Sequence, residues 1–169
     1  MKTISEYLEK PLAVVQPSIW KKSFELKYED EQLCSISFPK TFRSKLVVEM
    51  FSGKWEIYQP GFWSSLIMIK EAGKDLPFAQ YKRSGFKPYG ILELPKGNRL
   101  KIAFKIFRLG WEIQTLSGVV LVSFRETYSV KHRVKVFIKK RNELLDKYPW
   151  IIVLAWYLAY KRRRSAAAH

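Results

Sequence analysis

Residues 149–160 form a run of twelve residues that carries no charged side chain and is apolar on every side when drawn as a helix. A helix that lies on one face of a sheet needs a single apolar stripe, whereas a helix that is apolar all round must be enclosed by protein or by lipid. Twelve helical residues extend roughly 18 Å, but the hydrocarbon core of a bilayer is about 30 Å thick. We therefore expect a helix over residues 141–163, broken near Pro149, whose apolar part is enclosed by the rest of the chain.

Residues 18–140 alternate between apolar and polar side chains, with the period of two that is typical of half-buried strands. Short turns that contain Gly, Pro or acidic residues interrupt this alternation. The pattern predicts strands near residues 18–29, 31–38, 45–52, 54–59, 64–71, 76–83, 90–95, 98–107, 110–116, 119–127 and 130–140. The connections are too short for crossover helices, so we expect consecutive strands to pair as antiparallel hairpins.

A long antiparallel meander leaves two unpaired edges, and closure into a barrel removes both. A closed barrel of this size has room for more than side chains, and an apolar helix would fill it. The predicted fold is mainly β: a closed antiparallel β-barrel of about eleven to twelve strands around a hydrophobic C-terminal α-helix. A helix inserted in lipid, and a sheet or sandwich with a docked helix, are the alternatives that the sequence leaves open.

The length of 169 residues is typical of one domain. We expect a single domain over residues 1–164, with a short N-terminal segment (1–17) and a tail derived from a purification tag (165–169). Thr3 followed by Glu6 predicts a short capped helix near residues 4–9, and Pro11 would end it. A twelfth strand could lie in residues 10–17. Glu6 and Glu9 interrupt the first ten residues, so no secretory signal peptide is expected there.

This order of elements, with many short strands and then an apolar helix, resembles the tubby-like C-terminal domain superfamily, which includes tubby, plant LURP-one-related proteins and phospholipid scramblases. The resemblance covers roughly residues 18–163. Residues 59–65 (QPGFWSS) and 150–160 also resemble segments of small bacterial members. The resemblance implies twelve strands closed around the helix. No phosphoinositide-site or metal-site motif of the family matches positions in this chain, so the resemblance implies the fold and no individual site residue.

The chain is strongly basic, with 31 Lys and Arg against 15 Asp and Glu and a net charge of +16. Such a charge attracts phosphate-bearing partners, either anionic lipid or nucleic acid. In the most basic strand, alternation places Lys131, Arg133 and Lys135 on the face opposite the apolar residues. The candidate anion- or lipid-binding residues are Lys131, Arg133, Lys135, Lys139, Lys140, Arg141, Arg99, Lys101, Lys105, Lys161, Arg162, Arg163 and Arg164.

Each basic cluster can also be explained without a bound ligand. The strand cations could form a solvated outer face, and residues 161–164 could solvate a chain end or flank an inserted helix. Phe62 and Trp63 follow a Pro-Gly turn, where they would either enter a lipid interface or cover the mouth of the barrel.

Nothing in the sequence predicts catalysis. Cys34 is the single cysteine, which is compatible with a reducing compartment, and its spacing places it among buried apolar residues. His132 shares the apolar face of its predicted strand, and residues 29–31 (EDE) are typical of a hairpin turn. No glycine-rich phosphate loop occurs. We therefore expect no catalytic residue, no metal and no cofactor.

The leading hypothesis is a non-enzymatic binding module for anionic phospholipid headgroups or another phosphate-bearing partner. It would be cytoplasmic and peripheral at the inner face of the membrane, without a transmembrane span. A nucleic-acid-binding barrel is the less favoured alternative, because no nucleic-acid-binding motif occurs. A protein-interaction or structural domain without a small ligand is a third.

Overall fold

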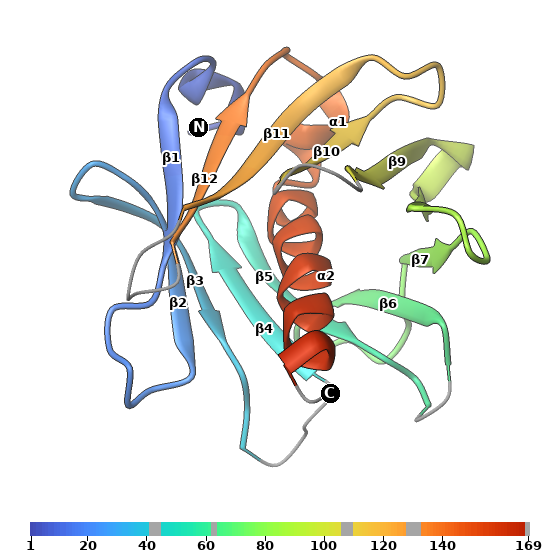
Figure 1. Ribbon diagram of the computed structural model, residues 1–169, viewed down its shortest axis with the longest axis horizontal. Helices are drawn as coiled ribbons and strands as arrows, with labels where there is room; N and C mark the ends of the chain where they lie inside the picture. Colours follow the sequence, from blue (N-terminus) through green and yellow to red (C-terminus); the bar gives the residue numbers. More distant parts are fainter. Residues whose placement is uncertain (41–44, 62–63, 106–109, 128–132, 168–169) are drawn as a thin grey trace.

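The computed structural model describes residues 1–40, 45–61, 64–105, 110–127 and 133–167. These residues form a mainly β structure in which twelve strands make one closed barrel. Each strand pairs with its neighbours in the chain, every pair is antiparallel, and β1 closes the barrel by pairing with β12 (Figure 1). The predicted fold class, a closed antiparallel barrel with a C-terminal helix, is confirmed.

The strands of the barrel are short. They are β1 (Pro11–Val15), β2 (Ser23–Tyr28), β3 (Glu31–Ser37), β4 (Lys45–Met50), β5 (Gly53–Tyr58), β6 (Leu66–Glu71), β7 (Ala79–Arg83), β8 (Tyr89–Glu93), β9 (Arg99–Phe104), β10 (Gly110–Gln114), β11 (Val120–Thr127) and β12 (Arg133–Ile138). The helical elements are η1 (Ile4–Tyr7), η2 (Pro95–Gly97), α1 (Glu143–Lys147) and α2 (Trp150–Ala167).

The twelfth strand is β1, which lies in the segment expected to hold it. The predicted strand boundary that differs most is the first: the strand expected to begin at residue 18 begins at Ser23, and residues 18–22 belong to the β1–β2 loop. Ile19 and Trp20 are consecutive apolar residues, so they do not alternate as a strand requires, and both are exposed. Parts of the strands predicted over 98–107 and 130–140 lie outside the described residues.

The helix α2 lies inside the barrel, where it runs along the middle of the structure (Figure 1). Residues 150–159 are each between 0% and 8% exposed. Because ten consecutive residues point to every side of a helix, the barrel must enclose this part of α2 all round. No helix of the described chain has the length and hydrophobicity needed to cross a membrane.

The predicted break near Pro149 is present, because α1 ends at Lys147 and α2 begins at Trp150. Proline fits just before a helix, where its missing N–H leaves no hydrogen bond unmade. Asn142 caps α1 by accepting a hydrogen bond from the Leu144 N–H at 2.9 Å. The helix α2 ends at Ala167, four residues beyond the predicted end at residue 163.

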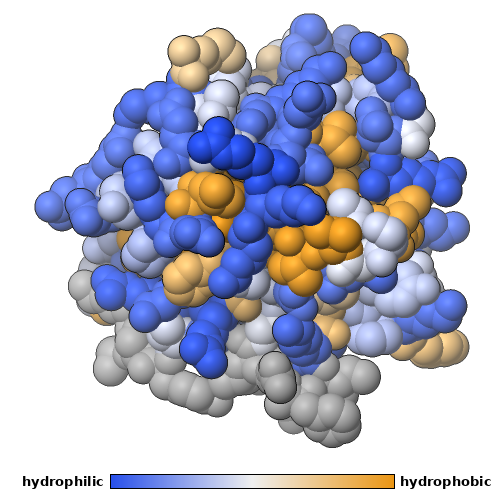
Figure 2. Space-filling view, turned by 90° about the horizontal axis from the view of Figure 1, so that it is seen from above, coloured by the Kyte–Doolittle hydropathy of each residue, from blue (hydrophilic) through white to orange (hydrophobic). Residues whose placement is uncertain are grey.

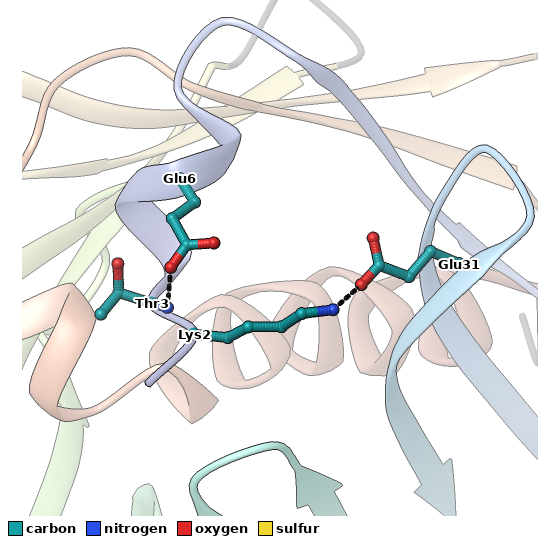
Figure 3. Close-up of polar contacts among 4 residues, drawn as sticks. All are labelled: Lys2, Thr3, Glu6 and Glu31. Carbon is teal, nitrogen blue, oxygen red and sulfur yellow. Dashed lines mark hydrogen bonds and ion pairs between the residues drawn. The ribbon is translucent and has the colours of Figure 1, made fainter.

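The N-terminal segment covers the end of the barrel at which α2 begins. The Glu6 carboxylate accepts a hydrogen bond from the Thr3 N–H at 3.1 Å, and Lys2 forms an ion pair with Glu31 at the β2–β3 turn (Figure 3). The Ser5 hydroxyl donates to Asp146 of α1 at 2.6 Å. We call this end of the barrel the α1 end. Seen from above, hydrophilic residues cover most of its surface and hydrophobic ones show near the centre (Figure 2).

The opposite end of the barrel, which we call the mouth, is where α2 leaves the barrel. Because the strands alternate in direction, β1, β3, β5, β7, β9 and β11 end there, and we call the six connections that follow these strands the mouth loops. An aromatic cluster packs α2 against the strands at this end. The ring centroid of Phe24 lies 4.7 Å from that of Trp156 and 5.4 Å from that of Tyr160.

Candidate anion-binding pocket at the barrel mouth

A pocket of about 240 Å³ opens at the mouth, between the last buried turn of α2 and the loops that precede β6 and β8. We call it the mouth pocket. Its inner wall is apolar, because the side chains of Ile67, Tyr81 and Leu158 line it and are themselves buried. Tyr89 and Phe104 add two aromatic rings nearer the outside. The pocket therefore offers an apolar floor to whatever enters it.

Four cations line the outer part of the mouth pocket: Arg83, Lys87, Lys161 and Arg162. We call them the rim cations. Arg83 ends β7, Lys87 lies in the β7–β8 turn, and Lys161 and Arg162 belong to the turn of α2 that follows its buried part. None of the described lining residues is acidic. The described pocket thus has an apolar floor and a cationic rim.

Neighbouring groups hold two of the rim cations in place. The Lys161 ammonium donates to the Gln59 side-chain carbonyl at 2.9 Å, and the Arg162 guanidinium lies 4.3 Å from the ring centroid of Phe104. Burial lowers the pKa of Lys161. Burial also lowers the pKa of Arg162, and the positive charge of Arg83 lowers it further while Tyr81 opposes this. Both directions indicate cations that water solvates incompletely and that an anion would stabilise.

Other cations near the mouth already have acidic partners. Arg163 contacts the Glu126 carboxylate at 3.1 Å, and Lys105 contacts the carboxylate of the buried Glu112 at 2.8 Å. The first pair links the end of α2 to β11, and the second links the residue after β9 to β10. The rim cations differ from them in facing a pocket without a described carboxylate.

Tyr81 forms part of the floor, and the positive charges of Arg83 and Arg162 both act on its hydroxyl. Burial raises the pKa of its hydroxyl to about 12, so the group stays protonated at neutral pH and can donate a hydrogen bond. Gly90 of the adjacent strand β8 makes room for the ring. A Cβ atom at position 90 would lie 2.2 Å from the Tyr81 hydroxyl oxygen and 2.3 Å from Cζ, far inside van der Waals contact.

We expect Gly90→Ala to destabilise the protein by about 1–3 kcal/mol, because the new methyl group overlaps a buried ring. Chemical denaturation would measure the loss. Gly61→Ala is the matched control, since the nearest atom to a Cβ at that position is 3.9 Å away. The cost of Gly90→Ala should shrink in a Tyr81→Ala background, as expected for residues in direct contact. A Gly90→Ala variant as stable as the native chain would contradict the close approach.

The structure brings only some of the predicted cations to the mouth pocket. Lys161 and Arg162 line it, whereas Arg164 lies with its guanidinium 5.8 Å from the ring centroid of Tyr160. Arg133 and Lys135 are exposed on the outer wall of the barrel, opposite the buried Val134 and Val136, so the predicted alternation of β12 is confirmed.

The remaining predicted cations lie elsewhere. Arg99 begins β9 at the α1 end, with its guanidinium 4.0 Å from the Glu93 carboxylate. Lys139, Lys140 and Arg141 follow β12 at the same end. Lys101 lies along β9, with its ammonium 5.3 Å from the ring centroid of Tyr89. Lys131, His132, Phe62 and Trp63 lie outside the described residues.

Sequence reasoning missed Arg83 and Lys87. The signal available was a hairpin turn, residues 82–87 (KRSGFK), that holds three cations and no acidic residue. A turn of this kind is usually solvated, and only closure of the barrel places it beside the end of α2.

The other polar candidates are consistent with a structural role. Cys34 is buried, as predicted, and burial raises the pKa of its thiol well above the usual range, which makes it a poor nucleophile. Residues 29 and 30 form the β2–β3 turn, as predicted. The described part of the chain contains no group of three His, Cys, Asp or Glu residues placed to hold a metal ion.

Comparison with protein families, with curated proteins and with solved structures finds no match to this chain.

Proposed function

We propose that this protein is a non-enzymatic binding module for the phosphate-bearing headgroup of an anionic lipid, and that the mouth pocket receives the headgroup. The proposal depends on one observation: the pocket has four cations at its rim and an apolar floor. None of the described residues that line it is acidic. A phosphate would take hydrogen bonds from Arg83 and Arg162, whose planar guanidinium groups match phosphate oxygens.

Two properties of the mouth pocket favour a lipid headgroup over a larger ligand. Its volume of about 240 Å³ lies below the range of drug-sized ligand pockets, so it suits a phosphate with the few atoms attached to it. The apolar floor also suits the carbon atoms that join a headgroup to its acyl chains. A free nucleic-acid strand offers phosphates but would need a longer groove with several stacking surfaces.

The architecture supports membership of the tubby-like superfamily, to which we assign the chain as part of this proposal. That superfamily includes the phospholipid scramblases. Twelve strands around a C-terminal helix are what the resemblance implies, and β1 supplies the strand missing from the sequence-based count. Because one fold can serve many functions, the headgroup hypothesis depends on the rim cations and not on the fold. A module of this kind would be cytoplasmic and peripheral at the inner face of the membrane.

Sedimentation with vesicles tests the proposal. We expect the native chain to bind vesicles that contain phosphatidic acid, to leave phosphatidylcholine vesicles unbound, and to bind soluble glycerol 3-phosphate in the pocket. Salt should weaken the binding, because exposed charges are screened within about 8–10 Å at 0.1–0.15 M.

Nucleic acid is the comparison that distinguishes the main alternative. Binding to single-stranded or duplex DNA with a steep salt dependence, together with no binding to phosphatidic acid vesicles or to glycerol 3-phosphate, would overturn the proposal. That result would favour the nucleic-acid hypothesis.

A further inference from the structure

The mouth also carries large hydrophobic side chains that extend into solvent. In the β1–β2 loop, Ile19 is 67% exposed and Trp20 is 89% exposed. In the β7–β8 turn, Phe86 is fully exposed. Both loops belong to the same end of the barrel, because they follow strands that run in the same direction. Most of the surface of these three side chains therefore faces solvent.

Cations adjoin each of these hydrophobic side chains. Lys21 and Lys22 follow Trp20 directly, and Lys87 follows Phe86. The described residues of the six mouth loops include no Asp or Glu. The α1 end differs, since Glu29, Asp30 and Asp75 lie in its turns. The two ends of the barrel therefore differ in their acidic residues, and among the described residues only the mouth combines exposed aromatic rings with loops that carry cations and no acidic residue.

We propose that the mouth is a membrane-docking surface and that the barrel stands on an anionic lipid surface with this end down. Trp20, Ile19 and Phe86 enter the boundary between headgroups and acyl chains, where aromatic side chains are favoured. The adjoining lysines remain at the level of the phosphates. This orientation rests on the proposed function, and it turns the opening of the mouth pocket toward the headgroups.

Charge complementarity is what selects lipid as the partner. A hydrophobic surface on its own could meet another protein, but separate aromatic side chains that each adjoin a cation match an anionic interface. The end of α2 adds to this match, because Arg162 and Arg164 are exposed at the same end of the barrel. Leu76 provides an internal comparison: it is 80% exposed, but it lies at the α1 end, next to Asp75.

Site-specific labelling tests the docked orientation. An environment-sensitive dye would be attached to Trp20→Cys, Phe86→Cys and Leu76→Cys variants, one at a time. Cys34 should stay unlabelled, because it is buried and its thiol pKa is raised. On addition of phosphatidic acid vesicles, we expect the dyes at positions 20 and 86 to shift to the blue and brighten. The dye at position 76 should not change.

Loss of the aromatic side chains gives a second and independent measurement. The double variant Trp20→Ser/Phe86→Ser should bind phosphatidic acid vesicles at least about tenfold more weakly, since exposed apolar area is lost from the contact. Its binding of soluble glycerol 3-phosphate should be unchanged. Leu76→Ser is the matched control and should affect neither measurement.

The two measurements separate the docking surface from the pocket. Full vesicle binding by the double variant, with no dye response at positions 20 and 86, would overturn the docking orientation and leave the pocket proposal intact. Failure of the native chain to bind either glycerol 3-phosphate or phosphatidic acid vesicles would overturn the proposed function itself. A dye response at position 76 equal to that at position 86 would also overturn the end-on orientation.

Discussion

Replacing Leu154 with Asp should abolish folding of the whole domain. Leu154 is 0% exposed and lies in the part of α2 that the barrel encloses. An isolated carboxylate there would lose its hydration without gaining a partner, at a cost of at least several kcal/mol. Because a domain is stable by only about 5–15 kcal/mol, this single change removes most or all of that margin. Ile151→Asp should have the same effect, since Ile151 is equally buried.

Soluble expression, circular dichroism and chemical denaturation would measure the effect. Ser165→Asp is a matched control on the exposed part of the same helix, and we expect it to change stability by less than about 0.5 kcal/mol. Leu154→Ala should remain folded but lose about 2–5 kcal/mol, because it leaves a cavity. A Leu154→Asp variant as stable as the native chain would contradict the enclosed helix. If the native chain could be extracted from cells only with detergent, a helix inserted in lipid would be favoured instead.

Replacing Arg83, Lys161 and Arg162 with Gln should weaken binding to phosphatidic acid vesicles by about 3 kcal/mol, on the order of a hundredfold. Each cation close to an anionic surface contributes about 1 kcal/mol. The melting temperature should stay the same or rise slightly. The folded protein holds Lys161 and Arg162 with lowered pKa values, so their positive charges disfavour the folded state, and neutral side chains remove that effect.

The matched control for this experiment removes three positive charges, those of Arg133 and Lys135 coming from the outer wall of the barrel. Replacing Lys131, Arg133 and Lys135 with Gln should change vesicle binding far less, because Arg133 and Lys135 lie on the outer face of β12 and do not line the mouth pocket. A hundredfold loss in this variant, with the pocket variant unaffected, would show that the strand predicted from the sequence binds lipid and that the pocket does not. A large loss of stability in the wall variant would contradict the alternation of β12.

The two basic clusters differ in how much of their role the sequence could predict. Alternation along β12 placed Arg133 and Lys135 on the outer face, because strand geometry depends only on neighbouring residues. The mouth pocket, in contrast, is formed by residues that lie far apart in the chain, so its prediction would have required knowledge of their contacts. Arg83 ends one strand and Arg162 lies in the C-terminal helix, and no local pattern relates them. Trp20 illustrates the same limit: the sequence predicts a strand from residue 18, but Trp20 lies exposed in a loop.

Residue patterns were enough to predict the short alternating strands, their turns, the buried Cys34 and a C-terminal helix that had to be enclosed. These properties follow from residue periodicity, turn chemistry and the cost of exposing an apolar helix, all of which act over a few residues. The closure of the barrel by β1, and the strand ends that meet the last turn of α2, are seen only in the three-dimensional structure. The rim cations become neighbours only when the strands close around α2. The position of a strand end around the barrel depends on all the strand pairings between it and the other residues of the pocket, and no local pattern contains that information.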